Sequence, residues 1–200
     1  METYGCQMNV ADSELIAGML HKQGYVVSKS MDNADAIFVN TCAIREHAEE
    51  KVHSRLGVYS RIKQNRPEVI IGVLGCMAQH LKDEILESKP YVDIILGPDS
   101  YRKLPVLLDR EIENTNSLVD TKLSRFEVYD NLFPSRQEGI NAWVSIMRGC
   151  DKFCTFCIVP FTRGRERSRS ITSIVNEVHK AIADGFVEIT LLGQNVNSYQ

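Results

Sequence analysis

Short β-branched runs alternate with longer helical patterns through the first half of the chain. Such runs predict strands of a few residues, and the longer patterns predict the helices that connect them. The predicted strands are Tyr25–Val27, Ala36–Asn40, Val69–Leu74 and Ile94–Leu96, with a stub at Thr3–Tyr4 that should continue upstream. This alternation favours an α/β fold with a doubly wound parallel sheet covered by helices.

The first predicted helix carries an apolar stripe between two boundary signals. Asp12, Ser13 and Glu14 supply a cap and an acidic first turn, and Gly24 follows the end. The stripe between them consists of Leu15, Ile16, Met19 and Leu20. Its spacing places these side chains on one face of a helix, which we expect to pack on the sheet.

Periodicity is lost between residues 109 and 139, where a polar stretch at 111–117 is unsuited to a core. We therefore predict a first domain over residues 1–110, a linker over 111–140 and the start of a second domain over 141–200. A strand at Ala142–Met147 and another at Val187–Leu192 flank a helix in this last part, which Gly185 ends. The predicted apolar face of that helix is Ile171, Ile174, Val175, Val178 and Ile182.

Composition narrows the classes of function. The 200 residues are 44% hydrophobic, carry a formal charge of -3 and have a pI of about 6.0, so any contact with nucleic acid must be regional. No apolar run approaches the ~18 residues of a membrane span, and the first residues lack the pattern of a signal peptide. We expect a cytoplasmic protein, and in that reducing compartment six cysteines indicate metal binding or catalysis rather than disulfides.

Three of the cysteines lie close together after the strand at Ala142–Met147. Cys150, Cys154 and Cys157 have CxxxCxxC spacing, which suits a cubane iron–sulfur cluster held from one side. Three thiolates leave the fourth iron open to a substrate. A zinc knob or a chance group of buried thiols are the alternatives.

The other three cysteines are far apart in sequence, but each follows a strand pattern. Cys6, Cys42 and Cys76 should meet where the carboxyl ends of parallel strands share one edge. Three unrelated buried cysteines are one alternative. Zinc is another, with His47 and His80 as further ligands, although we interpret both histidines as surface residues.

The loop around Cys150, with an aromatic residue before its last cysteine, resembles the signature loop of radical S-adenosylmethionine (SAM) enzymes. The resemblance implies that the open iron chelates the methionine part of SAM, and that an electron cleaves SAM to a 5′-deoxyadenosyl radical. It places Phe156 against the SAM adenine, with simple hydrophobic packing as the alternative. Gly193, Gln194 and Asn195 resemble the turn that holds the SAM amino group, with an amide in place of the commoner carboxylate; alone they would be an ordinary turn.

Longer stretches resemble the methylthiotransferase family within that superfamily. They are residues 3–14 around Cys6, 40–45 around Cys42, 75–78 around Cys76, and 148–169, which contain the second cysteine group. The resemblance implies two 4Fe-4S clusters, two uses of SAM, and sulfur insertion at carbon 2 of an isopentenylated adenosine next to the tRNA anticodon. Gln7 and Met8 after Cys6 favour this tRNA branch over the branch that modifies a ribosomal-protein aspartate. Catalytic residues beyond the clusters are not assigned.

Other substrates and roles stay open on the sequence. They are a threonylcarbamoyl-adenosine tRNA, the ribosomal aspartate, or a non-catalytic metal-binding RNA scaffold. Compared with the family, the chain begins inside the first strand and stops after the second barrel strand, so we expect it to be inactive alone. The expected partners are the tRNA anticodon stem-loop and a reductant, with no membrane and a monomeric state.

A basic segment follows the second cysteine group. The segment contains four arginines and one acidic residue, Glu166. The arginines are Arg163, Arg165, Arg167 and Arg169. Guanidinium groups match phosphate and carboxylate geometry, so we expect contacts with tRNA phosphates or the SAM carboxylate. A solvated loop with salt bridges is the alternative.

Overall fold

Five parallel strands form the main sheet of the computed structural model, which describes residues 1–28, 30–42, 46–111, 117–136 and 139–200. Neighbouring strands follow one another in sequence, and every pair is parallel. The strands are β1 (Glu2–Tyr4), β2 (Ala36–Thr41), β3 (Ile70–Gly75), β4 (Ile94–Leu96) and β5 (Leu118–Asp120). The parallel sheet predicted from the sequence is confirmed.

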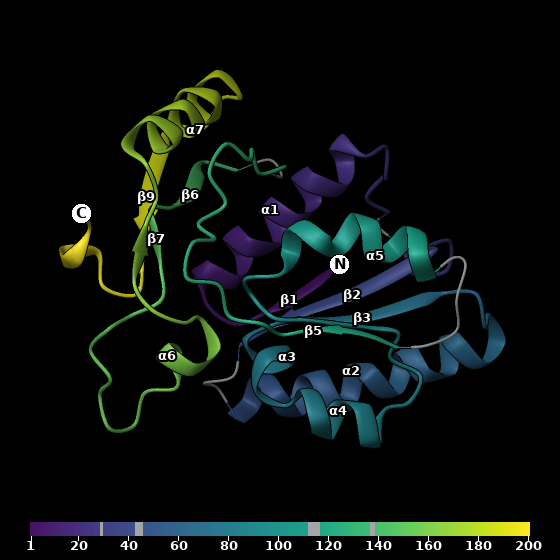
Figure 1. Ribbon diagram of the computed structural model, residues 1–200. Helices are drawn as coiled ribbons and strands as arrows, with labels where there is room; N and C mark the ends of the chain where they lie inside the picture. The colour runs from purple at the N-terminus through teal and green to yellow at the C-terminus, as the bar shows by residue number, and fades with distance from the viewer. Residues whose placement is uncertain (29, 43–45, 112–116, 137–138) are drawn as a thin grey trace.

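Helices cover both faces of this sheet (Figure 1). One layer holds α1 (Gln7–Lys22), the short helix η1 (Tyr101–Lys103) and α5 (Leu104–Glu111); the other holds α2 (Glu46–Asn65), α3 (Cys76–His80) and α4 (Lys82–Ser88). Each layer closes its own apolar core against the sheet, one around Ile16 and Leu74 and one around Leu56 and Val73. Alternate residues of β3 serve the two cores, because successive side chains of a strand point to opposite faces.

Two details of the predicted sheet were wrong. Tyr25–Val27 is not a strand but part of the loop after α1, where Val26 is 87% exposed and the Tyr25 hydroxyl donates to Asp109 at 2.8 Å. Its β-branched residues have no neighbouring strand with which to pair. Conversely, β5 lies inside the segment predicted as a linker, and its residue Leu118 pairs with Ile94 of β4.

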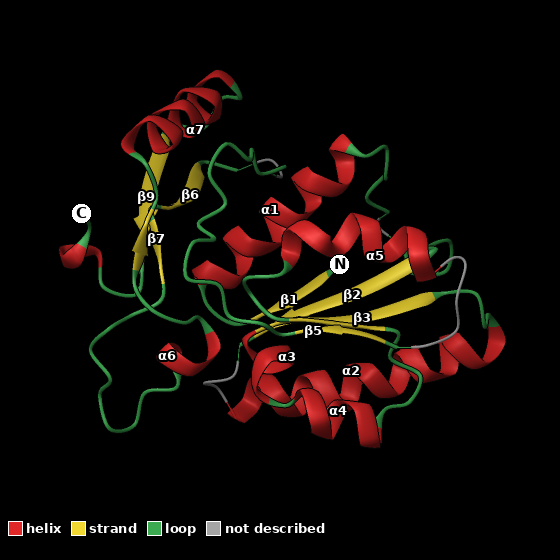
Figure 2. Cartoon of the chain, in the orientation of Figure 1, coloured by secondary structure: helices red, strands yellow, loops and turns green. Residues whose placement is uncertain are grey.

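The second unit begins with β6 (Asn141–Ser145), which pairs in parallel with β9 (Glu188–Leu192). Between them lie β7 (Met147–Arg148), α6 (Val159–Thr162), β8 (Arg167–Ser168) and α7 (Ile171–Ala183), and η2 (Val196–Ser198) follows (Figure 2). Ser170 caps α7 by accepting a hydrogen bond from the backbone N–H of Ser173. The predicted sequence of strand, loop, helix and strand is confirmed.

The apolar face of α7 is only partly buried. Ile174 and Val178 pack on β6 and β7, whereas Ile171 and Ile182 are more than half exposed. Among the described residues, no element covers that side of the helix. No described helix is both long and apolar enough to cross a membrane.

Candidate metal centres and SAM site

The first three cysteines lie just beyond one row of the sheet. Tyr4, Thr41 and Gly75 are in register across β1, β2 and β3. Cys42 and Cys76 follow this row directly, and Cys6 follows it by two residues. Parallel strands therefore bring the three loops to one edge, as the sequence predicted from their position after strands.

Two glycines allow the chain to turn at this edge. Gly5 and Gly75 have φ values of 147° and 94°, which side chains rarely adopt. A Cβ at Gly5 would lie 2.9 Å from the Cβ of Cys42, and a Cβ at Gly75 would lie 2.3 Å from Oδ1 of Asn40. Any other residue would push these loops apart, so the glycines are needed for the cysteines to approach one another.

Cys6 is poised as a thiolate. It is the N-cap residue of α1, and its carbonyl accepts the backbone N–H of Asn9 at 2.9 Å. Hydrogen bonding with Cys42 lowers the pKa of Cys6 to about 5; backbone N–H groups and the charge of Arg163 act in the same direction, against burial. Thiolates are the form in which cysteines bind metals. In the described part of the chain, no three His, Cys, Asp or Glu side chains already have the spacing of a metal site.

Polar side chains behind the cysteines form a buried network that sequence reasoning missed. Asn40 Nδ2 donates to the carbonyl of Asn9 and to Oγ of Ser13, both at 2.9 Å. Ser13 in turn bonds with Thr3 at 2.7 Å. An asparagine inside an otherwise apolar strand was the available signal, because buried amides are retained where they have partners.

The second three cysteines lie on the loop between β7 and α6. Cys154 is exposed, and Cys150 and Cys157 are partly exposed. The backbone N–H of Cys157 donates to the carbonyl of Cys154, and that of Cys150 donates to the carbonyl of Gly164. The loop thus carries three thiols that solvent can reach, with a turn from Cys154 to Cys157 and with Cys150 bonded to Gly164.

The candidate SAM residues lie on two separate segments. Phe156 is 95% exposed, so its ring does not pack in the hydrophobic interior, which was the alternative to a contact with SAM. Gly193 follows the end of β9, and a Cβ there would lie 2.5 Å from Cγ of Met147 in β7. The turn of Gly193, Gln194 and Asn195 therefore lies against the strand that leads to Cys150. Oε1 of Gln194 is buried and accepts no hydrogen bond from the described residues.

The predicted substrate-binding arginines have different environments. Arg163 and Arg167 are 3% and 8% exposed and bond with Asp12 and Asp99 of the first unit. Arg165 is exposed and pairs with Asp151 at 2.6 Å. Arg163 and Arg167 therefore form buried ion pairs rather than the solvated salt bridges of the alternative. Arg165, exposed and paired with Asp151, fits that alternative, and a tRNA contact of this residue stays a prediction.

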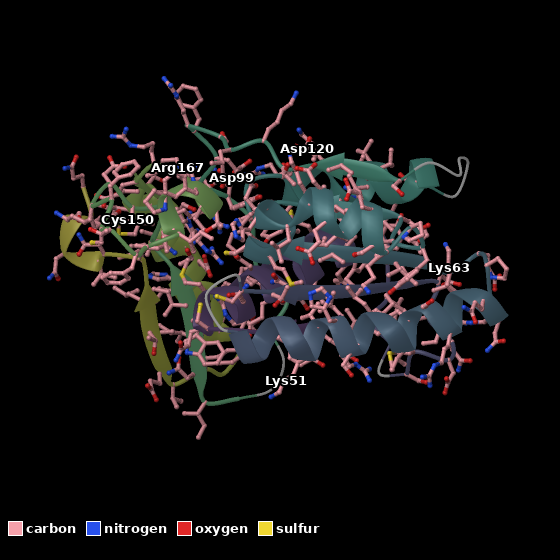
Figure 3. All side chains as sticks on the ribbon, turned by 90° about the horizontal axis from the view of Figure 1, so that it is seen from below. Lys51, Lys63, Asp99, Asp120, Cys150 and Arg167 are labelled. Carbon is pink, nitrogen blue, oxygen red and sulfur yellow. The ribbon has the colours of Figure 1, made fainter. Side chains whose placement is uncertain are left out.

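Buried carboxylates join the two units, which the sequence did not reveal. Asp12 of α1 accepts from Arg148 at 2.8 Å and from Arg163 at 2.9 Å. Burial raises the pKa of Asp12, but these two guanidinium groups outweigh it and hold the pKa below its usual value. Figure 3 shows Arg167 beside Asp99, which forms a second such pair at 2.8 Å.

The two cysteine sites lie next to each other. α3, which begins at Cys76, contacts α6, which follows the loop of Cys157 (Figure 1). His80 is exposed at the end of α3, in agreement with its interpretation as a surface residue. The side chain of His47 and the residues 43–45 of the predicted motif lie outside the described part.

Two families and several curated relatives match this chain. Residues 1–97 match the Uncharacterized protein family UPF0004, and residues 144–200 match the Radical SAM superfamily. The whole chain is 51% identical to tRNA-2-methylthio-N(6)-dimethylallyladenosine synthase of Bacteroides fragilis, 50% to that of Bacteroides thetaiotaomicron and 49% to that of Chloroherpeton thalassium. In each case the chain spans 44% of the relative's length.

These matches imply 4Fe-4S clusters and SAM as cofactors, and the residues present fit them. The first site has a cysteine with a pKa of about 5 and, beside it, a buried guanidinium nitrogen of Arg163 that no described acceptor uses. The second site offers three free thiols on one loop. Sulfur ligands and N–H donors to sulfur are the usual surroundings of such clusters. The chain therefore joins a UPF0004 domain to a Radical SAM domain, and along its whole length it is similar to the tRNA-2-methylthio-N(6)-dimethylallyladenosine synthases.

Proposed function

We propose that this chain is the cofactor-binding part of a tRNA methylthiotransferase that modifies carbon 2 of dimethylallyl-adenosine. The observation that carries the proposal is the pairing of two three-cysteine sites, one at the edge of a parallel sheet and one on a neighbouring loop. The two Bacteroides relatives are named for the dimethylallyl substrate, which supports that substrate over the threonylcarbamoyl and aspartate alternatives. We further propose that the protein works in the cytoplasm as a monomer with a separate reductant.

Each group of residues has a distinct task in this proposal. Cys150, Cys154 and Cys157 would hold three irons of one cluster and leave the fourth for SAM. When bound, that cluster supplies the electron that cleaves SAM to a radical, which unactivated C–H bonds require. The exposed ring of Phe156 offers a stacking face for adenine, and the turn at Gly193 offers polar groups to the methionine part.

The first site would hold the second cluster, through Cys6, Cys42 and Cys76. Its position at the junction with the second unit brings that cluster close to the SAM site. The exposed guanidinium of Arg165 is the one predicted phosphate contact that solvent can reach.

Iron and sulfide content after anaerobic reconstitution tests the two-site proposal. We expect about eight irons in the wild-type chain, and about four when either cysteine triple is changed to alanine. The control is His80→Ala, which removes the exposed histidine of the zinc alternative and should keep all the iron. Bound zinc, or the loss of all iron from one triple variant, would refute the proposal.

The substrate is tested in the organism that makes the protein. Deleting the gene should leave dimethylallyl-adenosine without its methylthio group, as measured by mass spectrometry of tRNA nucleosides. Methylthio groups on threonylcarbamoyl-adenosine and on ribosomal proteins should stay. Loss of either of these instead would assign the chain to another branch of the family.

A further inference from the structure

Arg163 crosses the junction between the two units. It directly follows α6, and its Nη2 donates to Oδ2 of Asp12 in α1 at 2.9 Å. The residue is 3% exposed, so its charge is confined to the interior. Asp12 also holds Arg148, which fixes the carboxylate from a second side.

The other terminal nitrogen of Arg163 has no acceptor. Nη1 is buried, and no described residue accepts a hydrogen bond from it. Burying a charged N–H without an acceptor is costly. Nε of Arg136, Arg148, Arg167 and Arg169 is also buried without an acceptor among the described residues, but Nη1 of Arg163 is the only terminal guanidinium nitrogen in this state there. The ion pair with Asp12 engages Nη2 alone, so Nη1 stays available to a ligand on another side of the guanidinium group.

The surroundings of Arg163 include the first cysteine site. Burial lowers the pKa of Arg163, but Asp12, Cys76, Tyr101 and Cys6 raise it well above its ordinary value. Two of these groups are cysteines of the first site. The backbone agrees with this position of Arg163 near the cysteines. Arg163 directly follows α6, and α6 contacts α3, which begins at Cys76. Nη2 already donates to Asp12, so Nη1 is the nitrogen that remains to donate to the cysteine site.

We propose that Arg163 is a positioning residue for the first cysteine site, where its Nη1–H donates a hydrogen bond to sulfur, either a cysteine thiolate or a cluster sulfide. This inference rests on the proposed function, because it requires a cluster at Cys6, Cys42 and Cys76. Reduction adds negative charge to a cluster, and a nearby cation with a hydrogen bond to sulfur stabilises the reduced form. A residue of the second unit thereby sets the potential of the cluster in the first.

The test uses the chain with Cys150, Cys154 and Cys157 changed to alanine, so that only the first cluster is present. Arg163→Ala and Arg163→Lys are compared in this background by iron content, electron paramagnetic resonance and redox titration. The control for the junction is Arg167→Ala, since Arg167 is also buried and paired with a carboxylate of the first unit. Nη2 of Arg167 donates to the backbone carbonyl of Arg163 at 2.7 Å, so this variant also tests whether a change in the backbone there is enough to move the potential. Thermal unfolding of each variant reports any loss of stability separately.

We expect Arg163→Ala to bind iron and to shift the potential to a more negative value. A tenfold fall in the reduction constant corresponds to ~59 mV for a one-electron couple. Arg163→Lys should recover part of the shift, because the charge stays but the two-pronged geometry is lost. Arg167→Ala should lower stability and leave the potential and the spectrum of the first cluster unchanged.

Different failures have different meanings. If the chain with Cys150, Cys154 and Cys157 changed to alanine binds no iron, both the proposed function and this inference are refuted. If it binds iron but Arg163→Ala keeps the wild-type potential and spectrum, only the inference is refuted. An equal shift in Arg167→Ala would also refute it, because the effect would then belong to the junction as a whole.

Discussion

At the scale of single residues, Glu14 shows how burial changes a charge. Its side chain lies beside Arg136 at 3.6 Å, and Arg136 also bonds with Glu177 of α7. Burial raises the pKa of Glu14 from 4.5 to about 7; Arg136 opposes this rise, and Glu177 adds to it. Two carboxylates thus share one arginine, and Glu14 binds its proton more tightly than an exposed glutamate does.

This shift predicts a pH dependence of stability. Between pH 4.5 and 7 the folded protein holds a proton on Glu14 that the unfolded chain releases, so stability falls as pH rises through this window. The wild-type chain should lose about 2–3 kcal/mol relative to Glu14→Gln between pH 4 and pH 8, measured by urea unfolding. A carboxyl carbon resonance of Glu14 that titrates near pH 4.5 would contradict this.

Four arginines of one segment show the limit of reasoning from residue type. Arg163, Arg165, Arg167 and Arg169 alternate in sequence, yet only Arg165 is exposed. Their partners are Asp12, Asp151, Asp99 and Glu177. Three of these carboxylates are buried, and the partner of Arg163 is 151 positions away in sequence. Local spacing indicates a basic segment, but only the tertiary fold determines which guanidinium groups meet solvent.

At the scale of elements, periodic segments were predictable and short ones were not. The strands β2, β3 and β4 have local patterns that agree with their final packing, and α7 is a helix as its pattern predicts, although Ile171 and Ile182 of its apolar face are exposed. β5 has three residues, and it is a strand because Leu118 and its neighbours pair with β4. Tyr25–Val27 has a better local pattern but no partner strand. Strand formation depends on pairing and burial more than on propensity.

The helix α1 is held by a segment that its own pattern does not predict. Residues 133–135 run along it, and the backbone N–H of Ser135 donates to the carbonyl of Glu14 at 2.8 Å. A Cβ at Gly18 would lie 2.2 Å from the carbonyl oxygen of Phe133. Gly18 is therefore needed for the close approach of two backbones.

Changing Gly18 to alanine should destabilise the chain by about 1–3 kcal/mol, although alanine is the better helix former. The matched control is Gly57→Ala in α2, where a Cβ meets no atom within 4 Å. There the gain in helix propensity should stabilise the chain by up to ~1 kcal/mol. Urea unfolding of both variants measures the difference, and equal gains would show that residues 133–135 do not pack on Gly18.

At the scale of the whole molecule, the position of the cysteine loops was predictable but the junction between the units was not. Strand ends of a parallel sheet share an edge, so the meeting of Cys6, Cys42 and Cys76 follows from topology. The ion pairs that join the units link residues that are far apart in sequence, such as Asp12 and Arg148, and have no local signature. The sequence therefore indicates two sites, and the structure is needed to show that they adjoin.

Buried pairs of this kind should make the two units unfold together. Asp99 accepts from both terminal nitrogens of Arg167, at 2.8 and 3.1 Å, and from the backbone N–H of Ser124. Asp99→Asn would leave a buried guanidinium without its counter-charge, which typically costs about 3–5 kcal/mol. Because that cost falls at the junction, we expect the second unit to unfold at a lower urea concentration than the sheet.

The fluorescence of the single tryptophan can report separate unfolding of the second unit. Trp143 lies in β6 of the second unit, so its fluorescence follows that unit, whereas far-ultraviolet circular dichroism mainly follows the larger first unit. The two curves should coincide for the wild type and separate for Asp99→Asn, since coincident probes indicate one cooperative transition. Asp184→Asn, which removes an exposed partner of Lys180, should change stability by at most ~0.5 kcal/mol and keep the curves together. Coincident curves in Asp99→Asn would mean that apolar packing, rather than the buried ion pairs, holds the two cysteine sites at a fixed separation.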